Sequence, residues 1–309
     1  NFKKPQFWNN KNTILPKILL PLSYLFNFLV YIKRKTTSQV EFDLPIICIG
    51  NIYLGGTGKT PMTILLSKEL TKLGKRPAIV KKFYSNHEDE HRLIRNYYKY
   101  FITSKNRKLG IRKAQSNNND SVILDDGFQD YKIKKDLNII CFNQNQLVGN
   151  GYTLPSGPLR EKMNSLKRSD IVMINGKKSE EFEKKIFSIN SNIEIYYSKY
   201  KPLNIKEFKN KKIIAIAGIG NPNNFFELLM QNNLELVEKL DYPDHYKFKK
   251  EELEKIIVRA KKNNCHILTT EKDYFRIKDY NLKEIKKVDV ILDIEKKESF
   301  LKKVIKVYD

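Results

Sequence analysis

A continuous apolar run that leads straight into a glycine-rich loop is the feature that most constrains this fold. Residues 44–50, "LPIICIG", have the pattern of a buried strand, and the stretch "GNIYLGGTGKTP" begins where that run ends. Residues 61–74 then have the pattern of a helix that ends at Gly74. A strand, a glycine loop and a helix in this order are typical of a phosphate-binding loop.

The loop departs from the strict G-x-x-x-x-G-K-[ST] pattern, because Tyr53 stands where the first glycine is expected. The parts that bind phosphate are nevertheless present. Backbone N–H groups at a helix N-terminus can surround phosphate oxygens, Lys59 can reach the β- and γ-phosphates, and the Thr60 hydroxyl can bind Mg²⁺. We therefore expect a nucleotide site made by Tyr53, Leu54, Gly55, Gly56, Thr57, Gly58, Lys59 and Thr60.

A metal site for phosphoryl transfer also needs an acid at the end of a strand. The segment "SVILDDGFQD" supplies Asp125 and Asp126 directly after an apolar run. The alternative is an ordinary Asp-Gly turn, since such dipeptides are common turn formers. The apolar lead-in and the glycine loop upstream favour metal or catalytic duty for both aspartates.

The rest of the chain alternates between strand and helix patterns, which predicts parallel sheets in an α/β fold. We expect a P-loop NTPase-like domain over residues 37–205 and a second, smaller α/β domain over residues 206–309. Further strands of the first domain are expected at 76–83, 121–126, 136–142 and 169–176, and strands of the second begin near 211, 265 and 288.

The N-terminal segment, residues 1–36, is different in kind. Residues 14–32, "ILPKILLPLSYLFNFLVYI", are nearly as long as the roughly 20 residues that a spanning helix needs, although prolines and polar residues interrupt them. The basic run "KRK" follows at 33–35. We expect a membrane-associated helix in, or partly in, the bilayer with its basic end on the cytoplasmic side. A buried core helix is the alternative.

Composition excludes some classes of protein. The formal net charge is +23, but lysine far outnumbers arginine, so we expect solvated surface charge and no nucleic-acid partner. The three cysteines, Cys48, Cys141 and Cys265, lie in apolar stretches without disulfide or metal-ligand spacing. They are expected to be buried strand thiols in a reducing compartment.

The segment "HEDEH", residues 87–91, matches the H-E-x-x-H pattern of zinc proteases. That chemistry needs a helix with an apolar face and a third ligand, and the sequence offers no evident third ligand. We therefore interpret His87 and His91 as exposed polar residues.

Several motifs in order along nearly the whole chain resemble the tetraacyldisaccharide 4'-kinase family, the lipid A kinases of Gram-negative bacteria. The motifs are "PQFW", "LLPLSYLF", "GNIYLGGTGKTP", "LDDGFQDY", "GNGYTLPSGPLRE", "AGIGNPNNFF", "YPDHYKF" and "TTEKD". The family's version of the phosphate loop also lacks the first glycine.

The resemblance implies transfer of the γ-phosphate of ATP to the 4'-hydroxyl of a tetraacyl glucosamine disaccharide 1-phosphate, a step of lipid A biosynthesis. It implies ATP and Mg²⁺ as cofactors, a membrane-embedded glycolipid as substrate, and action at the cytoplasmic face of the bacterial inner membrane. We expect a monomer.

The resemblance also implies residue roles. Lys59 and Thr60 match the phosphate and Mg²⁺ ligands, and Asp89 and His245 match a catalytic base and its paired histidine. An acidic metal and catalytic cluster is matched by Asp125, Asp126 and Glu161, with Arg160 beside it.

The chain departs from the family's pattern between Lys81 and Ala114, the segment that contains Asp89. Two alternatives stay open at this point. One is a partition-type ATPase, although Leu54 stands where that branch has a lysine. The other is a binding module that has lost its activity.

Overall fold

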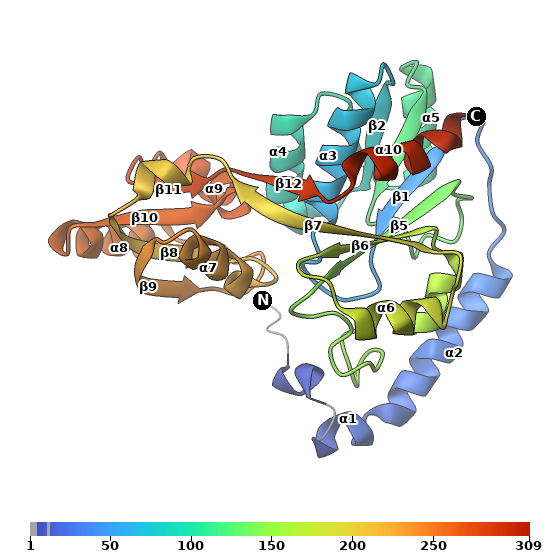
Figure 1. The fold of residues 1–309 in the computed structure, drawn as a ribbon, viewed down its shortest axis with the longest axis horizontal. Helices are drawn as coiled ribbons and strands as arrows, with labels where there is room; N and C mark the ends of the chain where they lie inside the picture. Colours follow the sequence, from blue (N-terminus) through green and yellow to red (C-terminus); the bar gives the residue numbers. More distant parts are fainter. Residues whose placement is uncertain (1–4, 11–12) are drawn as a thin grey trace. The chain divides into compact units, whose positions relative to one another are not determined.

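The computed structural model describes residues 5–10 and 13–309, which divide into two compact units (Figure 1). The larger unit contains the described residues up to Phe83 together with Tyr100–Lys199 and Asp293–Asp309. The smaller unit contains Tyr84–Lys99 and Tyr200–Leu292. Residues 1–4 and 11–12 of the predicted N-terminal segment lie outside the described residues.

The larger unit is built from helices and strands in alternation. Its elements are η1 (Gln6–Asn9), α1 (Ile14–Ile18), α2 (Leu20–Thr36), β1 (Ile46–Gly50), α3 (Lys59–Lys72), β2 (Pro77–Lys82), β3 (Phe101–Ser104), α5 (Arg107–Ser116), β4 (Ser121–Asp125), β5 (Leu137–Asn143), η3 (Met163–Arg168), β6 (Ile171–Asn175), α6 (Glu180–Phe187), α10 (Lys297–Ile305) and η6 (Lys306–Tyr308). Strands β7 (Glu194–Pro202) and β12 (Val290–Ile294) each have residues in both units.

The smaller unit repeats the same kind of alternation. Its elements are η2 (Ser85–His87), α4 (Glu88–Tyr97), η4 (Ile205–Phe208), β8 (Lys212–Ala217), α7 (Pro222–Gln231), β9 (Glu235–Asp241), α8 (Lys250–Lys262), β10 (Cys265–Thr270), α9 (Glu271–Ile277), η5 (Lys278–Tyr280) and β11 (Ile285–Val288).

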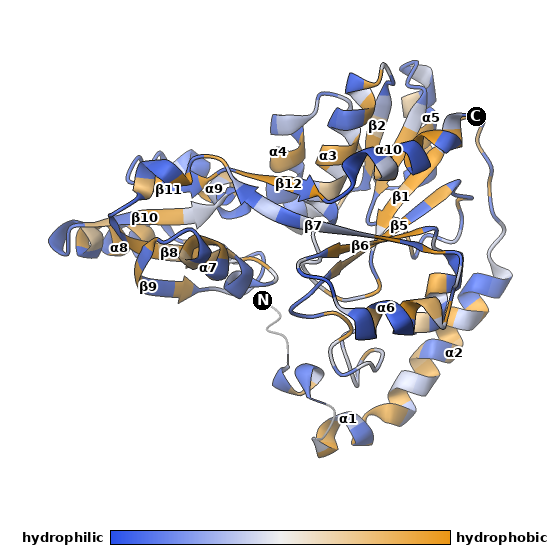
Figure 2. Cartoon of the chain, in the orientation of Figure 1, coloured by the Kyte–Doolittle hydropathy of each residue, from blue (hydrophilic) through white to orange (hydrophobic). Residues whose placement is uncertain are grey.

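Two parallel sheets carry the fold, as the alternating pattern predicts. The larger sheet has the strand order β12-β7-β6-β5-β1-β4-β2-β3, and its neighbours from β7 to β3 pair in parallel. The smaller sheet has the order β11-β10-β8-β9, also parallel. The central strand β1 and the middle of β5 are apolar (Figure 2) and buried, as parallel strands covered on both faces must be.

The cysteines follow this burial only in part. Cys48 in β1 and Cys141 in β5 are buried, as predicted, and burial raises the pKa of their thiols to about 11 and about 12. Cys265, at the start of β10, is only half-buried, which corrects the prediction for that residue.

Aspartates set the register at the start of the larger sheet. Asp120, Asp136 and Asp170 each stand just before a strand, and each carboxylate accepts a hydrogen bond from a backbone N–H beside the neighbouring strand, at 2.7 Å in every case. In return, the backbone N–H of each aspartate donates to the carbonyl of the same residue whose N–H its carboxylate binds. These reciprocal pairs satisfy backbone groups that the ladder leaves open at its first rung.

The division of the chain differs from the predicted boundary at residue 206 in two segments. Residues 84–99 belong to the smaller unit because α4 packs against α9, where Arg92 bonds Asp279 and the Tyr97 hydroxyl donates to Glu271. Residues 293–309 belong to the larger unit, where the Phe300 ring packs edge-on against Tyr196. Both differences arise from packing between segments that are distant in sequence.

The N-terminal helices hold the larger unit by their polar side. Ser23 is buried, and its hydroxyl donates to the Thr153 carbonyl at 2.9 Å, while the Asn27 amide donates to the Thr153 hydroxyl at 2.8 Å. Apolar residues recur along α1 and α2 (Figure 2), and many of them are exposed. In the described part of the chain, no helix combines the length and the apolar character that a membrane crossing requires.

Replacement of Asp136 tests whether these reciprocal aspartate–backbone hydrogen bonds stabilise the sheet. Asp136→Ala leaves the buried N–H of Ile46 without its side-chain acceptor, so the free energy of unfolding should fall by about 1–3 kcal/mol. Chemical denaturation measures the change. Asp43→Ala, at an exposed aspartate three residues before Ile46, is the matched control and should change the free energy by less than about 0.5 kcal/mol. Equal losses in the two variants would contradict the account.

Candidate active site

The phosphate loop and the acidic "DDG" segment meet because their strands are neighbours. β1 and β4 pair in parallel with Ile49 opposite Asp125, so both loops leave the same edge of the sheet. The approach is close, since a Cβ atom on Gly50 would lie 2.5 Å from the Cβ of Phe128. Only glycine at position 50 allows the two segments to pass each other.

The glycine loop has the form that phosphate binding requires. Helix α3 begins at Lys59, directly after Gly58, whose φ of 89° lies in the left-handed region. The buried Asn51 holds the loop from inside, because its amide donates to the carbonyls of Tyr53 (2.6 Å) and Gly55 (3.3 Å) and to the Thr57 hydroxyl (3.0 Å). The first turn of α3 therefore presents its free N–H groups at a fixed place.

Tyr53 and Leu54, the other two predicted members of the loop, pair with a later segment. Tyr53 is buried and forms a β-bridge with Leu159, and the Leu54 N–H donates to the Pro158 carbonyl at 2.8 Å. A tyrosine at the position of the missing glycine is thus part of the core beneath the loop.

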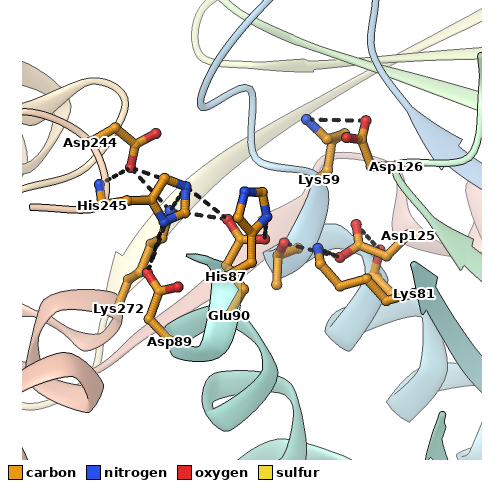
Figure 3. Close-up of polar contacts among 12 residues, drawn as sticks. Lys59, Lys81, His87, Asp89, Glu90, Asp125, Asp126, Asp244, His245 and Lys272 are labelled. Atoms are coloured by element: carbon orange, nitrogen blue, oxygen red, sulfur yellow. Dashed lines mark hydrogen bonds and ion pairs between the residues drawn. The ribbon is translucent and has the colours of Figure 1, made fainter. Parts of the chain in front are cut away.

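Asp125 is the centre of a buried polar group in the larger unit (Figure 3). It is fully buried, its carboxylate pairs with the Lys81 ammonium, and the Thr60 hydroxyl donates to it at 3.2 Å. Lys81 stands opposite Asp125 in the register of β2 and β4. A buried carboxylate is stable here because a cation and hydroxyl groups compensate its charge.

Asp126 lies beside Asp125 but faces different partners. The Arg160 guanidinium binds both of its carboxylate oxygens, at 2.9 and 3.0 Å, and the Lys59 ammonium lies 3.6 Å away. Burial alone would raise the pKa of Asp126, but the charges of Lys59 and Arg160 outweigh it and hold the pKa below its ordinary range. The residue has a φ of 57°, and Arg107 donates to its carbonyl at 2.7 Å. We call Lys59, Thr60, Lys81, Asp125 and Asp126 the phosphate-loop cluster.

Glu161 directly follows Arg160 in the chain. It is buried, and its partners are different from those of the phosphate-loop cluster. Its carboxylate accepts from Arg168 at 2.5 Å and from the Gln129 amide at 3.2 Å. Arg168 in turn stacks over the Phe128 ring, 4.3 Å from its centroid. Among the described contacts none joins Glu161 to Thr60 or Asp125, so its metal role stays a prediction.

The smaller unit brings Asp89 and His245 together, as the resemblance implies. Helix α4 buries Asp89, and the His245 Nδ1 lies 3.4 Å from its Oδ2 atom (Figure 3). Arg276 of α9 donates to the same oxygen through Nε (2.8 Å) and Nη2 (2.5 Å), and Lys272 lies 3.8 Å away. With Glu90 and Asp244 these residues form what we call the Asp89 cluster.

The cations of this cluster control Asp89. Burial would raise its pKa, but the nearby His245 imidazole and the charges of Lys272 and Arg276 hold the pKa below its ordinary range. His245, Lys272 and Arg276 all face Oδ2. The other oxygen, Oδ1, is buried and has no hydrogen-bond partner among the described residues. Asp89 is therefore ionised at neutral pH, and its Oδ1 atom is left to accept a hydrogen bond from a proton donor.

The interpretation of "HEDEH" needs correction. Residues 88–97 form a helix with a buried face, and His91 on that face is buried rather than exposed. His87 is half-buried and stacks on His245, with ring centroids 4.5 Å apart. The two histidines of the motif thus lie in different surroundings, which does not fit the paired ligands of a zinc protease.

Comparison with known proteins identifies the family. The model of the family described as tetraacyldisaccharide-1-P 4'-kinase matches residues 15–97 and 88–308. The chain belongs to the tetraacyldisaccharide-1-P 4'-kinase family. A tetraacyldisaccharide 4'-kinase of Pelagibacter ubique is 42% identical over 309 residues, covering 99% of this chain and 98% of the relative. One of Rickettsia canadensis is 31% identical, covering 98% and 96%.

A solved structure supports the fold. LpxK from Aquifex aeolicus, solved in complex with ATP, matches with a TM-score of 0.73 at 23% identity, covering 96% of this chain and all of that one. The predicted family, kinase class and P-loop α/β fold are confirmed. The partition-type ATPase is not supported, in agreement with Leu54 at the position of its lysine.

Sequence reasoning missed several residues of the two clusters and of the contacts that hold their neighbours in place. The only sequence feature that could have indicated them is a polar residue inside an apolar or motif segment. They are Asn51, Thr63, Lys81, Arg107, Gln129 and Arg168 in the larger unit and Glu90, Asp244, Lys272 and Arg276 in the smaller one.

Replacement of Arg276 tests the electrostatics of Asp89. Arg276→Gln removes a full charge and keeps an amide donor, so the pKa of Asp89 should rise toward its ordinary range. Carboxyl ¹³C NMR over a pH series measures it. Arg259→Gln, which breaks a pair with Glu238 in the same unit, is the control and should leave Asp89 unchanged. An unmoved Asp89 titration in Arg276→Gln would show that the cation does not set it.

Proposed function

We propose that this kinase transfers the γ-phosphate of ATP to the 4'-hydroxyl of a tetraacyl glucosamine disaccharide 1-phosphate. The observation that carries the proposal is the phosphate-loop cluster in a member of this kinase family. The names of the relatives supply the acceptor, and the Aquifex aeolicus structure supplies ATP as the nucleotide.

The larger unit holds the nucleotide in this proposal. The N–H groups of the loop and the first turn of α3 bind the phosphate oxygens, where the helix dipole is favourable. Lys59 neutralises charge on the transferred group, and its pairing with Asp126 keeps the ammonium at the loop before the nucleotide arrives. Arg160 holds Asp126 from the other side.

The residues present fit Mg²⁺. Thr60 and Asp125 are oxygen donors within 3.2 Å of each other, one from the loop and one from the end of a neighbouring strand, which is the donor pair that P-loop enzymes use. Asp126 and Glu161 complete the acidic set in this proposal. When bound, Mg²⁺ neutralises negative charge on the phosphates.

The smaller unit supplies the base. A sugar hydroxyl is a poor nucleophile, and it needs a carboxylate within hydrogen-bond reach to take its proton as the bond to phosphorus forms. The Oδ1 atom of Asp89 has this role, while Arg276 and His245 fix the carboxylate through Oδ2. A low pKa keeps Asp89 ionised and favours proton transfer late in the reaction, when the hydroxyl has become acidic.

The N-terminal helices supply the contact with the membrane. Ser23 and Asn27 bind the larger unit, which leaves the apolar residues of α2 exposed beside the basic residues at its end. A helix that turns its polar stripe to the protein and its apolar residues to solvent suits the boundary of a bilayer. We place the enzyme at the cytoplasmic face of the inner membrane, where its glycolipid substrate is embedded.

Mass spectrometry of the lipid tests the proposed function directly. Purified full-length protein with ATP, Mg²⁺ and the disaccharide lipid should give a product with one more phosphate. Lys59→Ala should give none, because it removes the cation of the loop. ATP binding without product would favour a binding module that has lost its activity.

The base role of Asp89 makes a kinetic prediction. Asp89→Asn keeps the shape but cannot accept a proton, so kcat should fall about 10²–10⁴-fold with little change in the KM for ATP. His245→Ala should have a smaller effect, and the double variant should be hardly worse than Asp89→Asn alone. A loss below about tenfold in Asp89→Asn would move the base role elsewhere, with Asp126 the next candidate.

The exposed face of α2 makes a binding prediction. Leu22, Leu25 and Leu29 are 54–57% exposed at helical spacing, and burying a leucine is worth about 1.5–3 kcal/mol. Replacing all three with glutamine should therefore weaken binding to anionic vesicles by well over about tenfold. Sedimentation with vesicles measures it. Leu109→Gln, at a leucine of α5 that is 57% exposed, is the control, and unchanged binding of the triple variant would disprove the role of α2.

A further inference from the structure

Three potential metal ligands from the smaller unit lie together beside Asp89 (Figure 3). His87 ends η2, Glu90 lies in the first turn of α4, and His245 follows β9. One ligand atom from each lies within 4.8 Å of the others. The His87 Nδ1 is 3.7 Å from one Glu90 oxygen, and the His245 Nε2 is 3.9 Å from the other.

These distances are close to those of a zinc site. Zinc–nitrogen and zinc–oxygen bonds of about 2.0–2.2 Å place neighbouring tetrahedral ligands about 3.3–3.6 Å apart. The two histidine–glutamate distances exceed this spacing by a few tenths of an ångström, and the set as a whole, which spans up to 4.8 Å, would need its side chains to close by about 1 Å. All three side chains are partly exposed, so a water molecule can complete the coordination.

His245 also has the support that a metal-binding histidine usually has. Its Nε2 atom faces Glu90, while its other nitrogen, Nδ1, faces the buried carboxylate of Asp89 at 3.4 Å. A carboxylate that orients the second nitrogen of a histidine is the common arrangement around protein-bound zinc.

We propose that His87, Glu90 and His245 form a binding site for a transition-metal ion, with zinc as the preferred ion. Two imidazoles and one carboxylate suit zinc and its neighbours rather than Mg²⁺. Bound metal would hold the His245 Nε2 atom and add positive charge next to Asp89, so it should inhibit the kinase. The inhibition rests on the proposed function, whereas the binding does not.

Lys272 is the competitor of the metal. Its ammonium lies 3.0 Å from Glu90 Oε1, 3.4 Å from the His245 Nε2 atom and 3.1 Å from Asp244 Oδ1. The lysine therefore supplies positive charge where the metal would bind. If the metal displaces its ammonium from Glu90, the flexible side chain can keep its ion pair with Asp244. Three carboxylates, those of Asp89, Glu90 and Asp244, face the two cations Lys272 and Arg276, so the cluster has negative charge left to attract a metal.

Zinc binding to the full-length protein tests the site. A competition titration with a chromogenic chelator, in Mg²⁺ buffer without ATP or lipid, should find one zinc ion per chain. His87→Ala and Glu90→Gln should each weaken binding by at least about tenfold, because loss of even a supporting residue costs about 10–100-fold. Lys272→Met should strengthen it. His266→Ala is the matched control, since His266 is exposed and stands next to the half-buried Cys265.

The kinase assay then tests the consequence. Zinc should inhibit the wild-type enzyme, and His87→Ala, with unchanged basal activity, should need at least about tenfold more zinc for the same inhibition. Equal zinc affinity in wild type and His87→Ala, an equal loss in His266→Ala, or no bound zinc would overturn the proposal. A protein that binds zinc as described but makes no lipid product would contradict only the proposed function.

Discussion

The register between β1 and β4 is the constraint on which the larger unit depends. Because Ile49 stands opposite Asp125, the glycine loop and the acidic segment leave the sheet at the same level. Lys81 stands opposite Asp125 on the other side and compensates its buried charge. At the far end of the strands, Asp136 fixes the register of β1 with β5, and Asp170 fixes that of β5 with β6. A slip of one residue would turn Asp125 to the other face of the sheet and separate it from Thr60.

The acids of both clusters are paired with cations before any substrate is present. Asp125 has Lys81, Asp126 has Arg160 and Lys59, and Asp89 has Arg276. Glu161, outside both clusters, has Arg168. Such pairs keep buried carboxylates ionised and in one geometry, which is the preorganisation that electrostatic catalysis needs. The charges of these cations hold the pKa of Asp126 and of Asp89 below the ordinary range, which lowers the basicity of both acids. The free Oδ1 atom of Asp89 is consistent with a base that works by position more than by strength.

Sequence patterns predicted the parts of the fold that depend on local order. The buried strands, the glycine loop and the aspartates at the end of β4 follow from residues that are adjacent in the chain. The motifs also indicated the family, because they recur in order over nearly the whole sequence.

What the sequence could not indicate depends on packing between distant segments. The membership of α4 in the smaller unit depends on contacts with α9, and the buried His91 depends on the face that α4 presents there. Lys81 is one of 58 lysine and arginine residues, and nothing in the sequence distinguishes it from the others. Its ion pair with Asp125 could therefore not be predicted. Arg276 likewise stands three residues beyond the "TTEKD" motif, at the helical spacing that brings it to Asp273.

The position of the new phosphate on the lipid product tests the central claim most directly. A two-dimensional ¹H–³¹P correlation spectrum of the product formed from ATP and the disaccharide lipid reads which sugar carbon bears the phosphomonoester. We expect a new correlation to the proton at carbon 4' of the distal glucosamine. A correlation to any other sugar proton, or inorganic phosphate as the only product of ATP, would contradict the assignment.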